Sequence, residues 1–151
     1  MAEGARVSEN TRRAQQLLVA GLAGGHAAAL TVVGLFWALA GPEAGATAAI
    51  GAVVTIAFYT IALGVQIAVA DAAPKVVMVA WLASYVTRVT LLGFGLATVL
   101  ANSERWEWLD PVALFTATIA TVLGWLGVEL WAYSRMRVPV YDPPAPRQSE
   151  M

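Results

Sequence analysis

The chain contains no cysteine and carries little charge. Without cysteine there is no disulfide, no thiolate nucleophile and no thiolate metal site. Asp, Glu, Lys and Arg together make up 13% of the 151 residues, whereas charged residues make up roughly 25% of a typical soluble domain. The net charge of −1 also lacks the basic excess that binding to nucleic acid requires. These absences exclude disulfide scaffolds and thiol enzymes, and we expect no nucleic acid among the partners.

Signatures of enzymes are missing as well. The sequence has no glycine-rich phosphate loop, no His/Asp/Glu cluster at metal-ligand spacing and no pairing of a nucleophile with a base. Gly93 and Gly95 lie in an apolar stretch without a preceding strand, so they do not form a dinucleotide motif. We therefore expect a protein that is not an enzyme, with no catalytic residue, no cofactor and no metal site.

Long apolar runs dominate what is present. Hydrophobic residues make up 59% of the chain, and a membrane-spanning helix needs about 20 consecutive apolar residues. The predicted spans cover residues 14–40, 43–70, 76–100 and 111–134. We predict an all-α polytopic membrane protein with a basic N-tail (1–13), a transmembrane domain of four helices (14–137) and a proline-rich C-tail (138–151).

The basic residues predict the orientation, because Lys and Arg concentrate in cytoplasmic segments. Those that precede span one, join spans two and three, or follow span four are Arg6, Arg12, Arg13, Lys75, Arg135, Arg137 and Arg147. The connection 101–110 on the other side has Arg105 against three acidic residues. We predict a multi-pass protein of the cell membrane, surrounded by the lipid bilayer, with both termini in the cytoplasm.

Ionisable groups inside the predicted spans are the main functional candidates. Arg88 lies near the middle of span three, where a charge costs about 2.5–3.5 kcal/mol and usually faces protein or water. His26 has a similar depth in span one, and either packs or takes part in a proton relay. Gln66 and Glu129 lie closer to the cytoplasmic surface. The sequence thus predicts a central polar layer and a second one facing the cytoplasm.

Glu129 is the acid within a span that best suits Arg88 as a partner. The helical rise of about 1.5 Å per residue puts the two residues on the order of 10 Å apart along the bundle axis. That offset is long for a direct ion pair. A direct pair, a link through water or Gln66, and a carboxylate that simply faces the headgroups all remain open.

Small residues recur at four-residue spacing in the first two spans. The pattern includes Gly21 and Gly25 in span one, and Gly45 and Gly51 in span two. Such spacing lets helix backbones approach closely in lipid. We expect spans one and two to pack through these faces, with a helix from another protein as the alternative occupant.

Three segments carry a resemblance to a known family. They are residues 45–65 (GATAAIGAVVTIAFYTIALGV), 81–92 (WLASYVTRVTLL) and 125–142 (WLGVELWAYSRMRVPVYD). With the arrangement of spans, they resemble the ATP synthase protein I family, in particular its actinobacterial-looking members. The third span of that family often reads Gly-Glu-x-x-Lys/Arg. Arg88 matches the cation, while Ser84 and Tyr85 stand in place of the glycine and the glutamate, and Glu129 stands where many relatives have glutamine.

The resemblance implies a non-enzymatic accessory protein, or chaperone, for the membrane sector of F-type ATP synthase. The expected role is to assist assembly of the c-ring, with the c subunit or other membrane-sector subunits as partners; a role in supplying divalent cations is also suggested for the family. The candidate residues for partner binding are Arg88, Glu129, His26, Gln66 and Tyr85.

Two other classes of function stay open at this stage. One is a small oligomeric cation (Mg²⁺) channel, in which Glu104, Glu107 and Asp110 would ring the outer mouth, although Arg88 at mid-depth would repel the ion. The other is a structural scaffold, in which no single polar residue matters. Whether copies of the chain form a homo-oligomer is also open.

Overall fold

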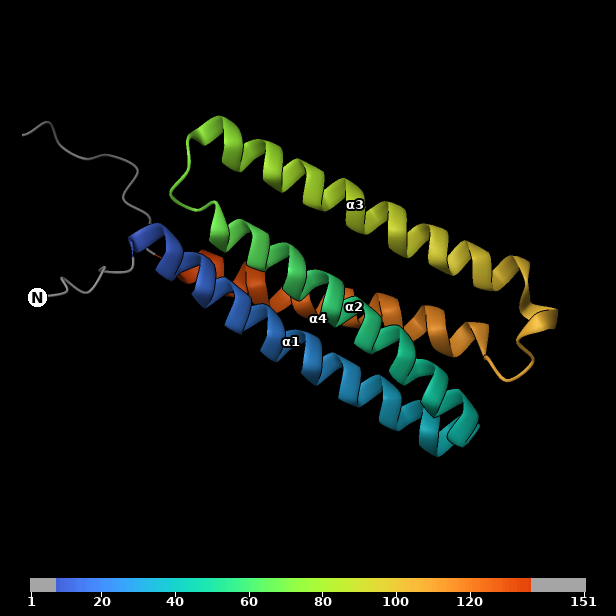
Figure 1. Cartoon of the computed structure of the whole chain (residues 1–151). Helices are drawn as coiled ribbons and strands as arrows, with labels where there is room; N and C mark the ends of the chain where they lie inside the picture. The colour runs from blue at the N-terminus through green and yellow to red at the C-terminus, as the bar shows by residue number, and fades with distance from the viewer. Residues whose placement is uncertain (1–7, 137–151) are drawn as a thin grey trace, which may run out of the picture.

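Four long helices form the described part of the chain (Figure 1). The structure is a computed structural model, and it describes residues 8–136. The helices are α1 (Glu9–Ala40), α2 (Pro42–Ala68), α3 (Pro74–Ala101) and α4 (Pro111–Arg135), with a short 3-10 turn, η1 (Ser103–Arg105), before α4. Residues 8–136 contain no strand, and each long helix is sufficiently long and apolar to cross a membrane. The prediction of an all-helical fold with four candidate spans is confirmed.

The helix ends follow from local chemistry. The hydroxyl of Ser8 accepts a hydrogen bond from the Thr11 N–H at 3.1 Å, which caps the first turn of α1. Residues 9–13, predicted as N-tail, are therefore helical, because a polar first turn needs only a cap and no apolar face. The carboxylate of Asp110 caps α4 in the same way. The predicted C-tail (138–151) lies outside the described residues.

A tight turn joins α1 to α2. Gly41 lies between the helices at φ +94°, a region that residues with a side chain rarely adopt. Pro42 then starts α2, where its missing N–H costs no hydrogen bond. The chain therefore reverses within one residue, and α1 and α2 pack as an antiparallel hairpin.

Helices α1, α2 and α4 form the packed core, and α3 lies at its side. Figure 1 shows α3 running beside the other three helices rather than among them. It packs along α2, barely touches α4 and has no buried residue. The other three helices supply all the buried residues of the core, so α3 is the least firmly held of the four helices.

The close contact between α1 and α4 depends on glycine and tryptophan. Trp125 is fully buried, and its indole lies against Gly21 and Gly25 of α1, leaving no room for a side chain at either position. At the neighbouring positions of the two helices, the backbones of Gly24 and Gly124 face each other. Small residues thus let the two helices approach closely, as small residues do in membrane helix bundles.

The glycines of α2 have different neighbours. Gly45 lies against Trp37 of α1, whereas Gly51 lies against Leu114 and Thr118 of α4. Helices α1 and α2 do pack together, as expected. The expectation was nevertheless incomplete, because four-residue spacing identifies a face that permits close approach and does not identify which helix covers it.

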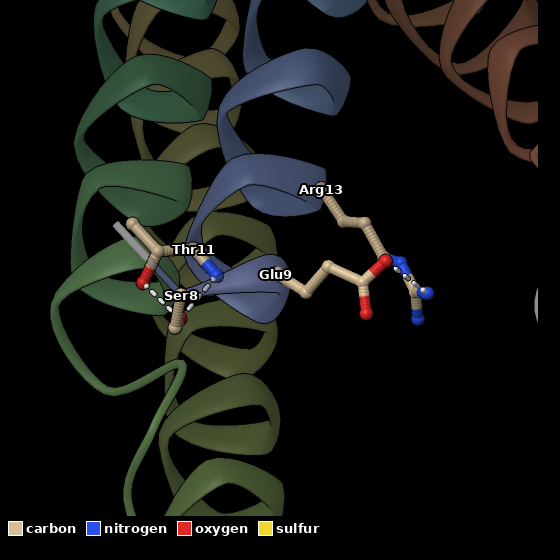
Figure 2. A network of polar contacts seen from close by, with 4 residues as sticks. All are labelled: Ser8, Glu9, Thr11 and Arg13. Atoms are coloured by element: carbon tan, nitrogen blue, oxygen red, sulfur yellow. Dashed lines mark hydrogen bonds and ion pairs between the residues drawn. The ribbon is translucent and has the colours of Figure 1, made fainter. Parts of the chain in front are cut away.

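A polar network fastens the start of α1 to the connection between α2 and α3. Figure 2 shows Ser8 with Thr11, and Glu9 with Arg13, whose ion pair measures 3.4 Å. The carboxylate of Asp71 accepts hydrogen bonds from the hydroxyls of Ser8 (2.7 Å) and Thr11 (3.2 Å). These bonds fix one end of α3 relative to α1, although the rest of α3 packs loosely.

Candidate partner-binding site

A cavity lined by residues of all four helices brings together four of the five candidate residues. Arg88, Glu129, Gln66 and Tyr85 all line it, and its volume is about 510 Å³. Most of the remaining wall is apolar: Leu17, Leu63, Trp81, Val89, Leu92, Leu126 and Leu130. The cavity is thus a mostly apolar chamber that contains one cation and one acid.

Arg88 points into this cavity and rests on an aromatic ring. Its guanidinium carbon lies 4.5 Å from the centroid of the Tyr59 ring, a cation–π contact. Its Nε donates a hydrogen bond to the carbonyl of Ser84 at 3.3 Å. The sole ion pair within residues 8–136 is Arg13–Glu9, so the direct Arg88–Glu129 pair, one of the possibilities open from the sequence, is not formed.

Glu129 is held by a residue of its own helix. The indole N–H of Trp125 donates a hydrogen bond of 3.0 Å to its carboxylate. The Trp125 ring also packs against the Tyr59 ring, with centroids 5.4 Å apart. An aromatic pair, Tyr59 and Trp125, therefore contacts both charged groups, the cation through one ring and the acid through the other.

Neither member of this aromatic pair was identified from the sequence. A signal for Trp125 was present, because residues four apart lie on one face of a helix and Trp125 precedes Glu129 by four. Tyr59 offered no such signal. Its place under Arg88 results from the packing of α2 against α3 and not from a spacing within one helix.

The cavity continues toward the end of the bundle where α1 begins. A second hollow of about 640 Å³, lined by Asn10 and Arg13 among others, shares Leu17, Gln66 and Trp81 with the first. Gln66 therefore lies where the two hollows meet. A charge in a membrane span is stabilised when it faces a cavity that water can enter, and two adjoining hollows of this kind would lower the cost of Arg88 there.

The rim of the cavity also faces sideways, between α3 and α4. Tyr85 stacks on Trp81 with ring centroids 5.9 Å apart and is 51% exposed, while Leu130 on α4 is 67% exposed. Few backbone contacts join α3 to α4, and these exposed rim side chains come from both helices.

His26 lies elsewhere. It is exposed on α1, with Nδ1 2.7 Å from the carbonyl oxygen of Leu22, and it lines a separate apolar hollow between α1 and α2. It shares no wall with Arg88, so the predicted central polar layer is not one cluster. A common depth does not place two residues on facing sides of their helices.

The acidic residues of the α3–α4 connection do not converge. Glu104 and Glu107 are exposed, and Asp110 caps α4. Within the described residues, no three His, Asp or Glu side chains lie close enough together to hold a metal ion.

No family model, curated protein or solved structure matches the chain. The resemblance to ATP synthase protein I stays a prediction from the quoted segments. The chemistry of the cavity is therefore the basis for assigning a function. A guanidinium with no carboxylate partner among residues 8–136, in a mostly apolar cavity, is suited to binding an anionic side chain.

Proposed function

We propose that this protein is a non-enzymatic accessory protein that assists assembly of the c-ring of F-type ATP synthase in the cell membrane. Both termini would lie in the cytoplasm, on the side with more basic residues. In this proposal the protein holds an unassembled c subunit by pairing Arg88 with its membrane-embedded carboxylate. The observation that carries the proposal is that Arg88 has no carboxylate partner among the described residues and lines a cavity whose wall includes the exposed Tyr85 of α3 and Leu130 of α4.

The chemistry of the partner fits this site. A c subunit is a glycine-rich helical hairpin with a carboxylate inside the membrane, and before assembly that carboxylate is exposed to lipid. An arginine binds a carboxylate through two parallel hydrogen bonds. Pairing therefore stabilises both charged groups in the membrane, since each ionisable group is costly in lipid without the other.

The size of the cavity limits how the partner binds. One turn of a helix 10–12 Å wide with a pitch of 5.4 Å occupies roughly 400–600 Å³, which is as large as the whole cavity of about 510 Å³. A complete helix therefore does not fit inside. We infer that the partner helix lies against the outside of α3 and α4 and inserts its carboxylate side chain toward Arg88.

Capture of the c subunit from mild-detergent membranes tests the proposal. The tagged protein is expected to recover c subunit, and Arg88→Ala is expected to lower recovery at least tenfold because the carboxylate loses its partner. Arg105→Ala is the matched control, since Arg105 is exposed in the connection between α3 and α4, and it should leave recovery unchanged. Equal recovery by the Arg88 and Arg105 variants, both eluting as folded protein, would show that Arg88 does not hold the partner.

A further inference from the structure

We propose that Trp125 keeps Arg88 free to bind a partner by holding the carboxylate of Glu129 away from it. This inference rests on the proposed function, and it concerns how the same site is kept open. Arg88 and Glu129 line one cavity and carry opposite charges, yet they form no ion pair. The carboxylate of Glu129 is bound instead by the indole N–H of Trp125.

Trp125 provides that group in a fixed position. Its side chain is fully buried and lies directly against Gly21 and Gly25 of α1, so the indole cannot turn without separating α1 from α4. Its N–H donates to Glu129 at 3.0 Å. Hydrogen bonds to an ionised acceptor are stronger than those between neutral groups, and this one anchors the carboxylate to its own helix.

Arg88 is held on the other side of the aromatic pair. The Tyr59 ring lies under the guanidinium at 4.5 Å and packs against Trp125. A cation–π contact holds an arginine in place without neutralising its charge. Arg88 therefore keeps its charge available for an external carboxylate while Glu129 remains bound to the indole.

If Trp125 lost its N–H, Arg88 would be the charged donor that lines the same cavity as Glu129. An Arg88–Glu129 pair formed within the protein would occupy the guanidinium and compete with the partner. Trp125 is in this sense a positioning residue. It acts on the partner through Glu129, so removing Glu129 should make the N–H dispensable.

The first experiment removes the N–H and then its target. Trp125→Phe is expected to lower capture of c subunit about tenfold, and adding Glu129→Gln to that variant should restore it. Both variants carry the same loss of packing at position 125, so restoration cannot come from repacking. Replacing Trp125 with benzothienylalanine, which has the shape of tryptophan without the N–H, should reproduce the loss if the phenylalanine variant fails to fold. Unchanged capture without the N–H, or a loss that Glu129→Gln does not restore, would overturn the inference.

A second measurement needs no partner and separates this inference from the proposed function. A double-mutant cycle with Arg88→Gln and Glu129→Gln, followed by thermal unfolding in detergent, measures the coupling between the two residues. We expect little coupling between Arg88 and Glu129 when Trp125 is present, and clear favourable coupling between them in the Trp125→Phe background. Equal coupling in both backgrounds overturns the role of Trp125. If the unaltered protein captures no c subunit, the proposed function is wrong, and the cycle still decides whether Trp125 positions Glu129.

Discussion

Gly124→Val is expected to destabilise the helix bundle strongly by forcing α1 and α4 apart. A Cβ at position 124 would meet the Cβ of Ala28 and lie 2.8 Å from the carbonyl oxygen of Gly24. Backbone cannot move aside as a flexible side chain does, so the two helices would have to separate. Inserting bulk into a packed core typically costs about 1–3 kcal/mol. Because backbone atoms are involved here, we expect the free energy of unfolding to fall by about 3 kcal/mol or more.

Thermal unfolding in detergent, followed by circular dichroism, measures this effect. Gly127→Val is the matched control: it is the same substitution on the same helix, at a position where a Cβ meets nothing within 4 Å. We expect it to change the free energy of unfolding by less than about 0.5 kcal/mol, as is usual for surface sites. Similar melting temperatures for the two variants would show that α1 and α4 do not make this close contact.

Arg88→Glu is expected to have the largest effect on binding. Removing one partner of a buried ion pair typically costs about 3–5 kcal/mol, so capture of c subunit should weaken by a factor of about 100 or more. The reversed charge adds repulsion between two carboxylates. Exchanging the charges should restore capture: the Arg88→Glu protein should recover a c subunit whose membrane-embedded carboxylate has been replaced by lysine.

Arg105→Glu controls for the change in net charge. Arg105 is exposed in the connection between α3 and α4, so reversing its charge should leave capture of the unaltered c subunit intact. The pairing hypothesis fails if the Arg88 and Arg105 variants behave alike. It also fails if the exchanged pair binds no better than either single variant.

The four helices were predictable, whereas their arrangement was not. Apolar runs of more than 20 residues separated by Gly41–Pro42, Pro74 and Asp110–Pro111 mark the helices and their ends. The peripheral place of α3 has no such signal. In lipid the outer surface of a bundle is as apolar as its core, so a helix with no buried residue resembles its neighbours in sequence.

The candidate site was also predictable only in part, because the sequence gives the depth of a residue along its helix but not the direction in which the residue faces. Arg88, Glu129, Gln66 and Tyr85 were each selected from the sequence, and the structure places them around one cavity. Rise per residue gives depth along a helix, but the rotation of each helix about its axis comes from tertiary packing. That rotation turns His26 away from the cavity and turns Tyr59 beneath Arg88.

Site-specific photo-crosslinking within α3 tests most directly whether a c subunit binds at this cavity. A photoreactive residue at position 85 would replace Tyr85, which lines the cavity, and one at position 86 would replace Val86, which is equally exposed (51% and 52%) but does not line it. We predict an adduct with c subunit from position 85 that disappears with Arg88→Ala, and little adduct from position 86. An adduct of equal yield from both positions, or none from position 85, would contradict binding at Arg88.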